Sequence, residues 1–203
     1  MLDGARRAAG RFGARLFAIL CFAILFAYPS GHAAGEQAAT SAPSGPSRET
    51  AMKAASFRAK DLKGQIVDLA ELLEEGPVFL HFWTTWCPSC QREMTRLDRL
   101  HRAYRDKGFH VVAIAQDDAK TVQKIKPLVT SKKFLMTVIA DSNKEIGNRY
   151  NVRQYPTCFL IAKDGAIVHY AQGYIPGDED QLEGLVRKLL GLEPSPAGSG
   201  SAK

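Results

Sequence analysis

The stretch "FWTTWCPSCQREM" (residues 82–94) decides the fold, because it carries two cysteines separated by two residues. Such a pair occurs in zinc knuckles, in haem attachment sites and in redox-active disulfides. A structural zinc site needs four ligands, but beyond the N-terminal segment only Cys158 remains, and no histidine stands at ligand spacing. Haem attachment requires a histidine directly after the second cysteine, where this chain has Gln91. The pattern therefore favours redox chemistry.

The residues around the pair predict a strand followed by a helix. Residues 78–83 form a nearly continuous apolar run, as expected of a strand buried on both faces. After the cysteines, apolar residues recur at helical spacing until Gly108, which ends the helix. Cys87 then lies at the helix N-terminus, where unpaired N–H groups and the helix dipole favour a thiolate, and Pro88 fits the first turn. We expect Cys87 to be the attacking thiol and Cys90 the resolving thiol.

The rest of the chain predicts one α/β domain with a mixed central sheet flanked by helices. We expect a helix over residues 119–131 that is bent or divided at Pro127. The remaining elements expected are a hairpin (57–69), a helical turn (70–75), strands (110–116 and 134–141), a short helix (143–152), two strands joined by a turn (157–173) and a final helix (178–190).

The two ends of the chain differ from this domain in composition. Residues 1–34 contain arginines, then an uncharged apolar run over 16–28, then small residues, as in a secretory signal peptide. As a helix the apolar run would reach about 20 Å against a hydrocarbon core of roughly 30 Å, which favours a cleaved signal over a membrane anchor, although the anchor stays open. Residues 35–56 read as a flexible linker, 57–192 as the domain and 193–203 as a disordered tail.

The net charge of +6 does not indicate a nucleic-acid partner. Of 27 basic and 21 acidic residues, four arginines and one aspartate precede residue 34, which leaves 23 and 20, or +3, for the remainder. No basic stripe interleaved with aromatic residues is present. We therefore expect a mildly basic, solvated surface. The signal-like N-terminal segment predicts that the domain is exported.

The motif "FWTTWCPSC" together with "YPT" (residues 155–157) resembles the thioredoxin fold. The hairpin-and-strand entry before the motif and the inserted helix and strand before "YPT" resemble its TlpA/ResA/CcmG-type branch, and the likeness runs from Phe57 to about Leu190. This resemblance implies an exported or membrane-tethered thiol–disulfide oxidoreductase with a thioredoxin-like fold. We expect no cofactor, and the lack of spaced ligands argues against a metal.

The resemblance also implies roles for residues around the disulfide. Pro156 should be a cis-proline facing the disulfide, with the carbonyl of Tyr155 or its neighbour free to pair with substrate. Trp86 should shield the disulfide. The expected substrate-binding residues are Trp86, Pro88, Tyr155 and Pro156. Glu93, three residues after Cys90, should tune the thiol pKa and shuttle protons. The alternative is a solvated glutamate near the start of the helix that only interacts favourably with the helix dipole.

Two positions depart from the expected pattern. His81 stands where cytoplasmic thioredoxins have a buried aspartate, six residues before the first cysteine. It is either a strand histidine with satisfied hydrogen bonds or a pH-sensitive modulator of Cys90. Cys158 follows the expected cis-proline, where a β-branched or small residue was expected. It is either a buried structural thiol or a partner in disulfide exchange with the active pair.

Four functions are compatible with these features to different degrees. The favoured one is reduction of disulfides in exported proteins, for example apocytochrome c, with electrons from a membrane thiol donor. The same chemistry run in reverse makes a disulfide donor, and the residues between the cysteines do not decide the direction. A peroxiredoxin-like peroxidase would have proline four residues before Thr84, where Leu80 stands. A copper chaperone usually spaces its cysteines by three residues and adds a distal histidine, which is absent here.

Overall fold

The computed structural model describes residues 52–175 and 177–192. The expected signal or anchor (1–34), most of the expected linker and the expected C-terminal tail lie outside these residues. In the part that is described, no helix combines the length and the apolar character needed to cross a bilayer.

A five-stranded mixed sheet forms the centre of the domain, in the order β5-β4-β3-β6-β7. The central strand β3 (Val78–Trp83) pairs in parallel with β4 (His110–Ala115), which pairs in parallel with β5 (Thr137–Ala140). On its other side β3 pairs antiparallel with β6 (Thr157–Ile161), which pairs antiparallel with β7 (Ile167–Gln172). Parallel crossovers followed by a hairpin produce this arrangement, which confirms the predicted mixed sheet.

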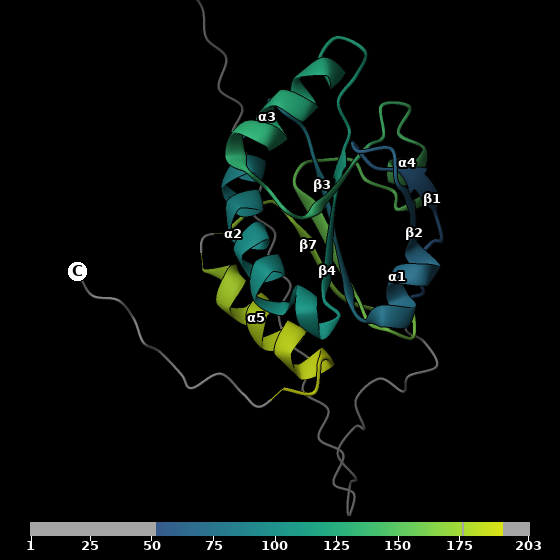
Figure 1. The fold of residues 1–203 in the computed structure, drawn as a ribbon, viewed down its shortest axis with the longest axis vertical. Coiled ribbons are helices and arrows are strands. Elements are labelled where there is room, and N and C mark those ends of the chain that lie inside the picture. The colour runs from purple at the N-terminus through teal and green to yellow at the C-terminus, as the bar shows by residue number, and fades with distance from the viewer. Residues whose placement is uncertain (1–51, 176, 193–203) are drawn as a thin grey trace, which may run out of the picture. The chain divides into compact units, whose positions relative to one another are not determined.

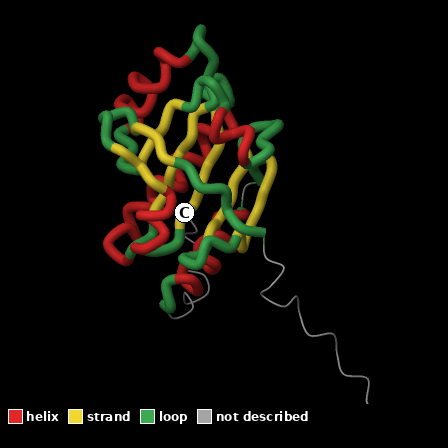
Figure 2. Tube along the Cα trace, turned by 90° about the vertical axis from the view of Figure 1, so that its right-hand side faces the viewer, coloured by secondary structure: helices red, strands yellow, loops and turns green. Residues whose placement is uncertain are grey.

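Helices cover both faces of the sheet (Figures 1 and 2). One face carries the helices α2 (Pro88–Tyr104), α3 (Ile125–Lys132) and α5 (Asp178–Leu189). The opposite face carries α1 (Leu69–Glu75), α4 (Glu145–Arg149) and the two-stranded hairpin of β1 (Arg58–Lys60) and β2 (Ile66–Asp68). Two short 3-10 helices, η2 (Arg105–Lys107) and η3 (Val122–Lys124), precede β4 and α3.

The alternation of side chains along β3 divides the apolar core into two clusters. All six residues of β3 are buried, and successive side chains point to opposite faces of the sheet. Phe79 and Trp83 pack in the cluster beneath α2, whereas Leu80 and Phe82 pack in the cluster on the α1 side. His81 shares the α2 side with Phe79 and Trp83, and this alternation places its imidazole under the helix that follows the cysteines.

The expected division of the 119–131 helix at Pro127 is wrong. The break lies earlier, where η3 ends at Lys124 and α3 begins at Ile125. Pro127 is the third residue of α3. Its missing N–H would have had no intrahelical partner in the first turn, so the proline can begin this helix rather than interrupt it.

Residues 52–56, which the sequence assigns to the linker, are hydrogen-bonded to the domain. The Ala54 N–H donates to the Gly165 carbonyl (2.9 Å), and the Ile167 N–H donates to the Met52 carbonyl (2.8 Å). The Tyr150 hydroxyl donates to the Ala55 carbonyl (2.8 Å). Backbone pairing of this kind needs no particular side chains, which is why the composition of the segment did not reveal it.

Candidate active site

The two cysteines lie where the central strand passes into α2. Cys87 is the N-cap residue of α2, and its sulfur accepts the backbone N–H of Cys90 (3.2 Å). Pro88 is the first helical residue. Cys87 and Cys90 form a disulfide with a Cα–Cα distance of 5.3 Å, within the usual range for such bonds. The free N–H groups and positive end of α2 therefore face the Cys87 sulfur and would favour its thiolate after reduction.

Burial distinguishes the two sulfurs. Cys87 is 6% exposed and Cys90 is fully buried, so only Cys87 can be reached by a protein substrate. The Ser89 hydroxyl lies 3.3 Å from the Cys87 sulfur. Trp86, directly before Cys87, is 62% exposed and offers a large apolar surface beside the reactive sulfur. Trp83 is instead fully buried in the core.

A second loop lies against the cysteine loop. The Tyr155–Pro156 peptide bond is cis, the geometry that the resemblance implies. The rings of Trp86 and Tyr155 meet edge to face with centroids 6.0 Å apart, which joins the two loops. The Pro156 carbonyl accepts the Gly173 N–H (2.9 Å), whereas the Tyr155 carbonyl has no hydrogen-bond donor among the described residues. That carbonyl is available to a substrate backbone.

Asp117 holds the loop that precedes Cys87, and sequence reasoning missed it. This carboxylate is fully buried. Its oxygens accept the Thr85 backbone N–H (2.9 Å) and the Thr85 hydroxyl (2.5 Å). The Gln91 side chain adds a hydrogen bond to the Thr85 carbonyl (2.8 Å). Asp117 follows β4 and is 32 residues from Thr85, so only its place just after a predicted buried strand could have pointed to it.

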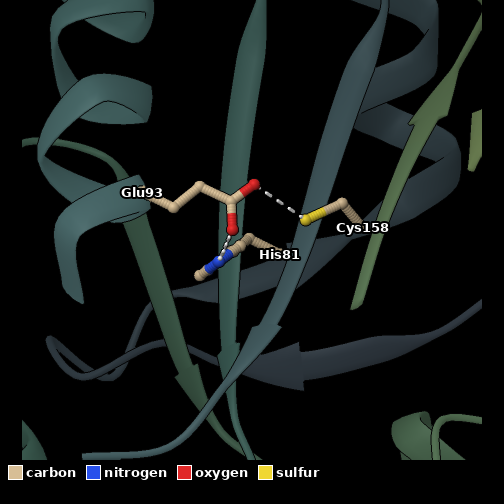
Figure 3. A group of neighbouring side chains, drawn as sticks. All are labelled: His81, Glu93 and Cys158. Carbon is tan, nitrogen blue, oxygen red and sulfur yellow. Dashed lines mark hydrogen bonds and ion pairs between the residues drawn. The ribbon is translucent and has the colours of Figure 1, made fainter. Parts of the chain in front are cut away.

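Glu93, His81 and Cys158 meet beneath α2 (Figure 3). Glu93 Oε2 lies 3.0 Å from His81 Nε2, and Glu93 Oε1 accepts a hydrogen bond from the Cys158 thiol (3.3 Å). The Glu93 side chain is 15% exposed and that of His81 is fully buried. Glu93 therefore reaches down toward the sheet rather than into solvent.

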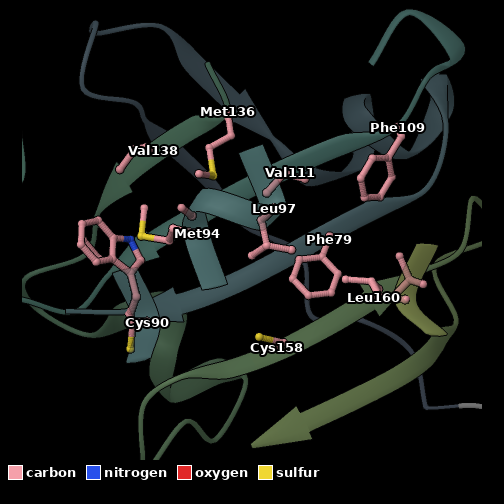
Figure 4. Close-up of a cluster of buried hydrophobic side chains, with 14 of the residues drawn as sticks. Phe79, Cys90, Met94, Leu97, Phe109, Val111, Met136, Val138, Cys158 and Leu160 are labelled. Atoms are coloured by element: carbon pink, nitrogen blue, oxygen red, sulfur yellow. The ribbon is translucent and has the colours of Figure 1, made fainter. Parts of the chain in front are cut away.

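The environment of Cys158 keeps its thiol protonated. Burial, followed by the negative charge of Glu93 and its hydrogen bond, raises the pKa of Cys158 well above the ordinary value. Cys158 belongs to the same buried cluster as Cys90, Met94 and Leu97 of α2 (Figure 4). Cys158 is a buried thiol, which is one of the two alternatives that the sequence left open. Its contact with Glu93 was not predicted, because the sequence does not show which residues β6 places under α2.

This fold, with a disulfide at the N-terminus of the helix that follows the central strand and a cis-proline loop beside it, defines a thioredoxin-fold thiol–disulfide oxidoreductase. The chain belongs to the AhpC/TSA family, whose model matches residues 50–170, and within it to the ResA group of thiol–disulfide oxidoreductases.

The relatives that support this assignment cover most of the domain. The chain is 32% identical over 171 residues to a thiol-disulfide oxidoreductase ResA of Bacillus cereus, covering 84% of this chain and 91% of the relative. It is 34% identical over 137 residues to a ResA of Bacillus thuringiensis, covering 68% and 76%. A Chlorobium tepidum protein assigned as thiol:disulfide interchange protein DsbE superposes with a TM-score of 0.63 at 27% identity, covering 69% of this chain and 96% of that one.

Proposed function

We propose that this protein reduces disulfides in proteins outside the cytoplasm, the cysteine pair of apocytochrome c being a natural substrate. The observation that carries the proposal is the difference between the sulfurs: Cys87 is the accessible one, at the N-terminus of α2, and Cys90 is enclosed behind it. The similarity to ResA, named a thiol-disulfide oxidoreductase, supports the chemistry.

The reaction proceeds by two thiol–disulfide exchanges. The Cys87 thiolate attacks one sulfur of the substrate disulfide, which forms a mixed disulfide and releases the other substrate sulfur as a thiolate. The Cys90 thiolate then attacks the Cys87 sulfur, which closes the Cys87–Cys90 disulfide and releases the second substrate thiolate. The substrate gains two electrons and the enzyme loses two. A membrane thiol donor returns them by the reverse exchange.

The surrounding residues have distinct parts in this proposal. Trp86 and Tyr155 form an apolar surface for the substrate chain, and the Tyr155 carbonyl accepts a substrate backbone N–H beside Pro156 and Pro88. Glu93, one turn after Cys90 on α2, accepts the Cys90 proton as that thiol becomes the attacking thiolate.

The reduction potential of the Cys87–Cys90 pair tests the direction of electron flow. Equilibration with glutathione, followed by mass spectrometry of alkylated protein, should give a value near or below that of thioredoxin, about −270 mV. A value near the −120 mV of a strong oxidant would instead make the protein a disulfide donor. In a separate assay without glutathione, the reduced enzyme should reduce an oxidised peptide with a Cys-x-x-Cys-His motif, which tests the substrate class.

Export is the second part of the proposal and rests on residues 1–34. Expression of the full chain followed by cell fractionation should place the domain outside the cytoplasm. N-terminal sequencing then distinguishes cleavage after Ala33 from an uncleaved anchor. Retention of the full chain in the cytoplasm would contradict export without affecting the redox chemistry.

A further inference from the structure

Three potential metal ligands converge on the α2 side of the sheet. His81 of β3 and Cys158 of β6 are direct partners in the antiparallel register, so their side chains leave the same face of the sheet next to each other. Glu93 of α2 lies over both (Figure 3). One imidazole nitrogen, one carboxylate oxygen and the sulfur all lie within 4.8 Å of one another.

The spacing of these atoms is close to that around a tetrahedral zinc ion. Zinc bonds of about 2.0–2.3 Å to nitrogen, oxygen and sulfur place neighbouring ligand atoms roughly 3.3–3.6 Å apart. Here His81 Nε2 lies 3.0 Å from Glu93 Oε2, and the Cys158 sulfur lies 3.3 Å from the other carboxylate oxygen, Oε1. An ion can therefore replace these two hydrogen bonds if the three groups, whose ligand atoms lie within 4.8 Å of one another, close in around it.

The charges of the three groups also suit a divalent ion. A neutral imidazole, a carboxylate and a thiolate together carry −2, which a Zn²⁺ ion neutralises, so the occupied cluster places no net charge in the buried layer under α2. Zinc binds this mixture of nitrogen, oxygen and sulfur ligands readily. On binding, the Cys158 thiol releases its proton to solvent and the imidazole carries its remaining proton on Nδ1. No electron is transferred.

A cavity gives the cluster a route to solvent. Its volume is about 420 Å³, and Glu93 and Cys158 lie on its wall together with Arg96, Tyr174 and Glu183. Three protein ligands and one open position are the arrangement of zinc sites that exchange a ligand. Water or a small solute in the cavity can supply the fourth ligand.

We propose that His81, Glu93 and Cys158 form a zinc-binding site whose fourth coordination position opens into this cavity. The three ligands do not stand at the regular spacing of a zinc motif along the chain, which is why no metal was predicted from the sequence. Glu93 is 12 residues from His81 and 65 from Cys158, and the register of β3 with β6 brings them together. An occupied site would engage the carboxylate that accepts the Cys90 proton in the proposed function, so the exchange reaction belongs to the metal-free protein. The site can therefore fail while the proposed function stands.

Cobalt and zinc titration of the oxidised full chain tests the site. Closing the Cys87–Cys90 disulfide leaves Cys158 as the free thiol among the described residues, and Cys21→Ser removes the one outside them. We expect one Co²⁺ per chain, a thiolate-to-cobalt charge-transfer absorption band, and displacement of cobalt by stoichiometric zinc. No band, or no binding, would overturn the proposal.

Variants identify the ligands. Cys158→Ser should abolish the charge-transfer band, and Glu93→Gln and His81→Asn should each weaken zinc binding by more than the 10–100-fold that loss of an outer-shell partner costs. His169→Asn is the matched control, because His169 lines the same cavity but is not one of the three ligands, so it should bind zinc normally. Circular dichroism of each metal-free variant verifies folding. If Cys158→Ser does not fold, a persisting affinity in folded Glu93→Gln and His81→Asn still contradicts the site.

Discussion

At the scale of single residues, the two sulfurs of the disulfide differ in access to solvent, and the proposed division of roles rests on this difference. Cys87 caps α2 and is slightly exposed, whereas Cys90 is enclosed in the core. Cys90→Ser should leave the attacking thiol but remove the resolving one, so mixed disulfides with substrate should accumulate and turnover should stop. Cys87→Ser should form none. Non-reducing electrophoresis with a disulfide substrate measures both, and full multiple turnover by Cys90→Ser would disprove the two-thiol mechanism.

Asp117 stabilises the loop before Cys87 through its two hydrogen bonds to Thr85. Asp117→Ala leaves the buried Thr85 N–H unpaired, and hydrogen bonds to a charged group contribute about 1.5–3 kcal/mol. We expect the free energy of unfolding to fall by about this amount in urea denaturation of the oxidised protein. The side chain of Asp106 is 85% exposed and forms a surface ion pair with Arg105, so Asp106→Ala should have a much smaller effect. Equal losses in the two variants would show that Asp117 has no special role in holding this loop.

At the scale of elements, α4 requires a residue without a side chain at Gly147. Asp141 accepts the backbone N–H groups of Glu145 and Gly147 (both 2.9 Å) and the Gln116 side-chain amide (2.5 Å). A Cβ at Gly147 would overlap the buried Gln116 side chain. Gly147→Ala should therefore destabilise the protein by about 1–3 kcal/mol despite the better helix propensity of alanine.

The matched control for Gly147 lies in α5. A Cβ at Gly184 would meet nothing within 4 Å, so Gly184→Ala should stabilise the protein by about 0.5–1 kcal/mol through helix propensity alone. Thermal unfolding of the two variants should thus shift in opposite directions. Stabilisation by both would show that Gln116 moves away without cost.

The buried face of α2 makes stability depend on pH through His101. Burial is the main cause that lowers the pKa of His101 below 6.5, with His110 and Arg105 acting in the same direction and Asp98 opposing them. The unfolded chain then binds a proton more readily than the folded one as the pH falls. The stability tied to neutral His101 is therefore complete above about pH 6.5 and is lost as the pH falls through the lowered pKa.

Urea denaturation between about pH 5 and 7 measures this dependence. The free energy of unfolding of the parent protein should decrease toward the acid end, and His101→Gln should reduce the slope. His169→Gln should leave the slope in place, because it retains His101. An unchanged slope in His101→Gln would assign the acid sensitivity to other groups.

At the scale of the whole molecule, the redox state should set the global stability. If the folded protein is a reductant, its disulfide form is the more stable one, whereas the strong oxidant DsbA is stabilised in its reduced form. The free energy of unfolding of the oxidised protein should exceed that of the reduced protein. The difference should be about 1.4 kcal/mol for every 30 mV by which the reduction potential of the folded protein lies below that of the unfolded chain. Urea denaturation of both forms measures the difference, and greater stability of the reduced form would indicate a disulfide donor.

Much of the fold could be predicted because its elements are determined by local patterns. The buried run of β3 and the helical spacing after Cys90 match the observed elements, and Gly108 ends the helical segment with a φ of 89° that favours glycine. The segment 52–56 and the start of α3 could not be predicted in the same way. Residues 52–56 are held by backbone hydrogen bonds, and α3 begins where the backbone changes from a 3-10 helix to an α-helix. The pattern of side chains encodes neither feature.

The candidate site divides in the same manner. By itself, the sequence predicted the redox pair from its spacing, and it predicted Cys87 as the attacking thiol from its place at a helix N-terminus. The cis-proline loop containing Pro156 was implied by the family resemblance. Only the tertiary structure decided that Asp117 holds the cysteine loop and that Glu93 turns toward His81 and Cys158. The physical reason is strand register: pairing of β3 with β6 and of β3 with β4 brings together side chains that are far apart in the chain.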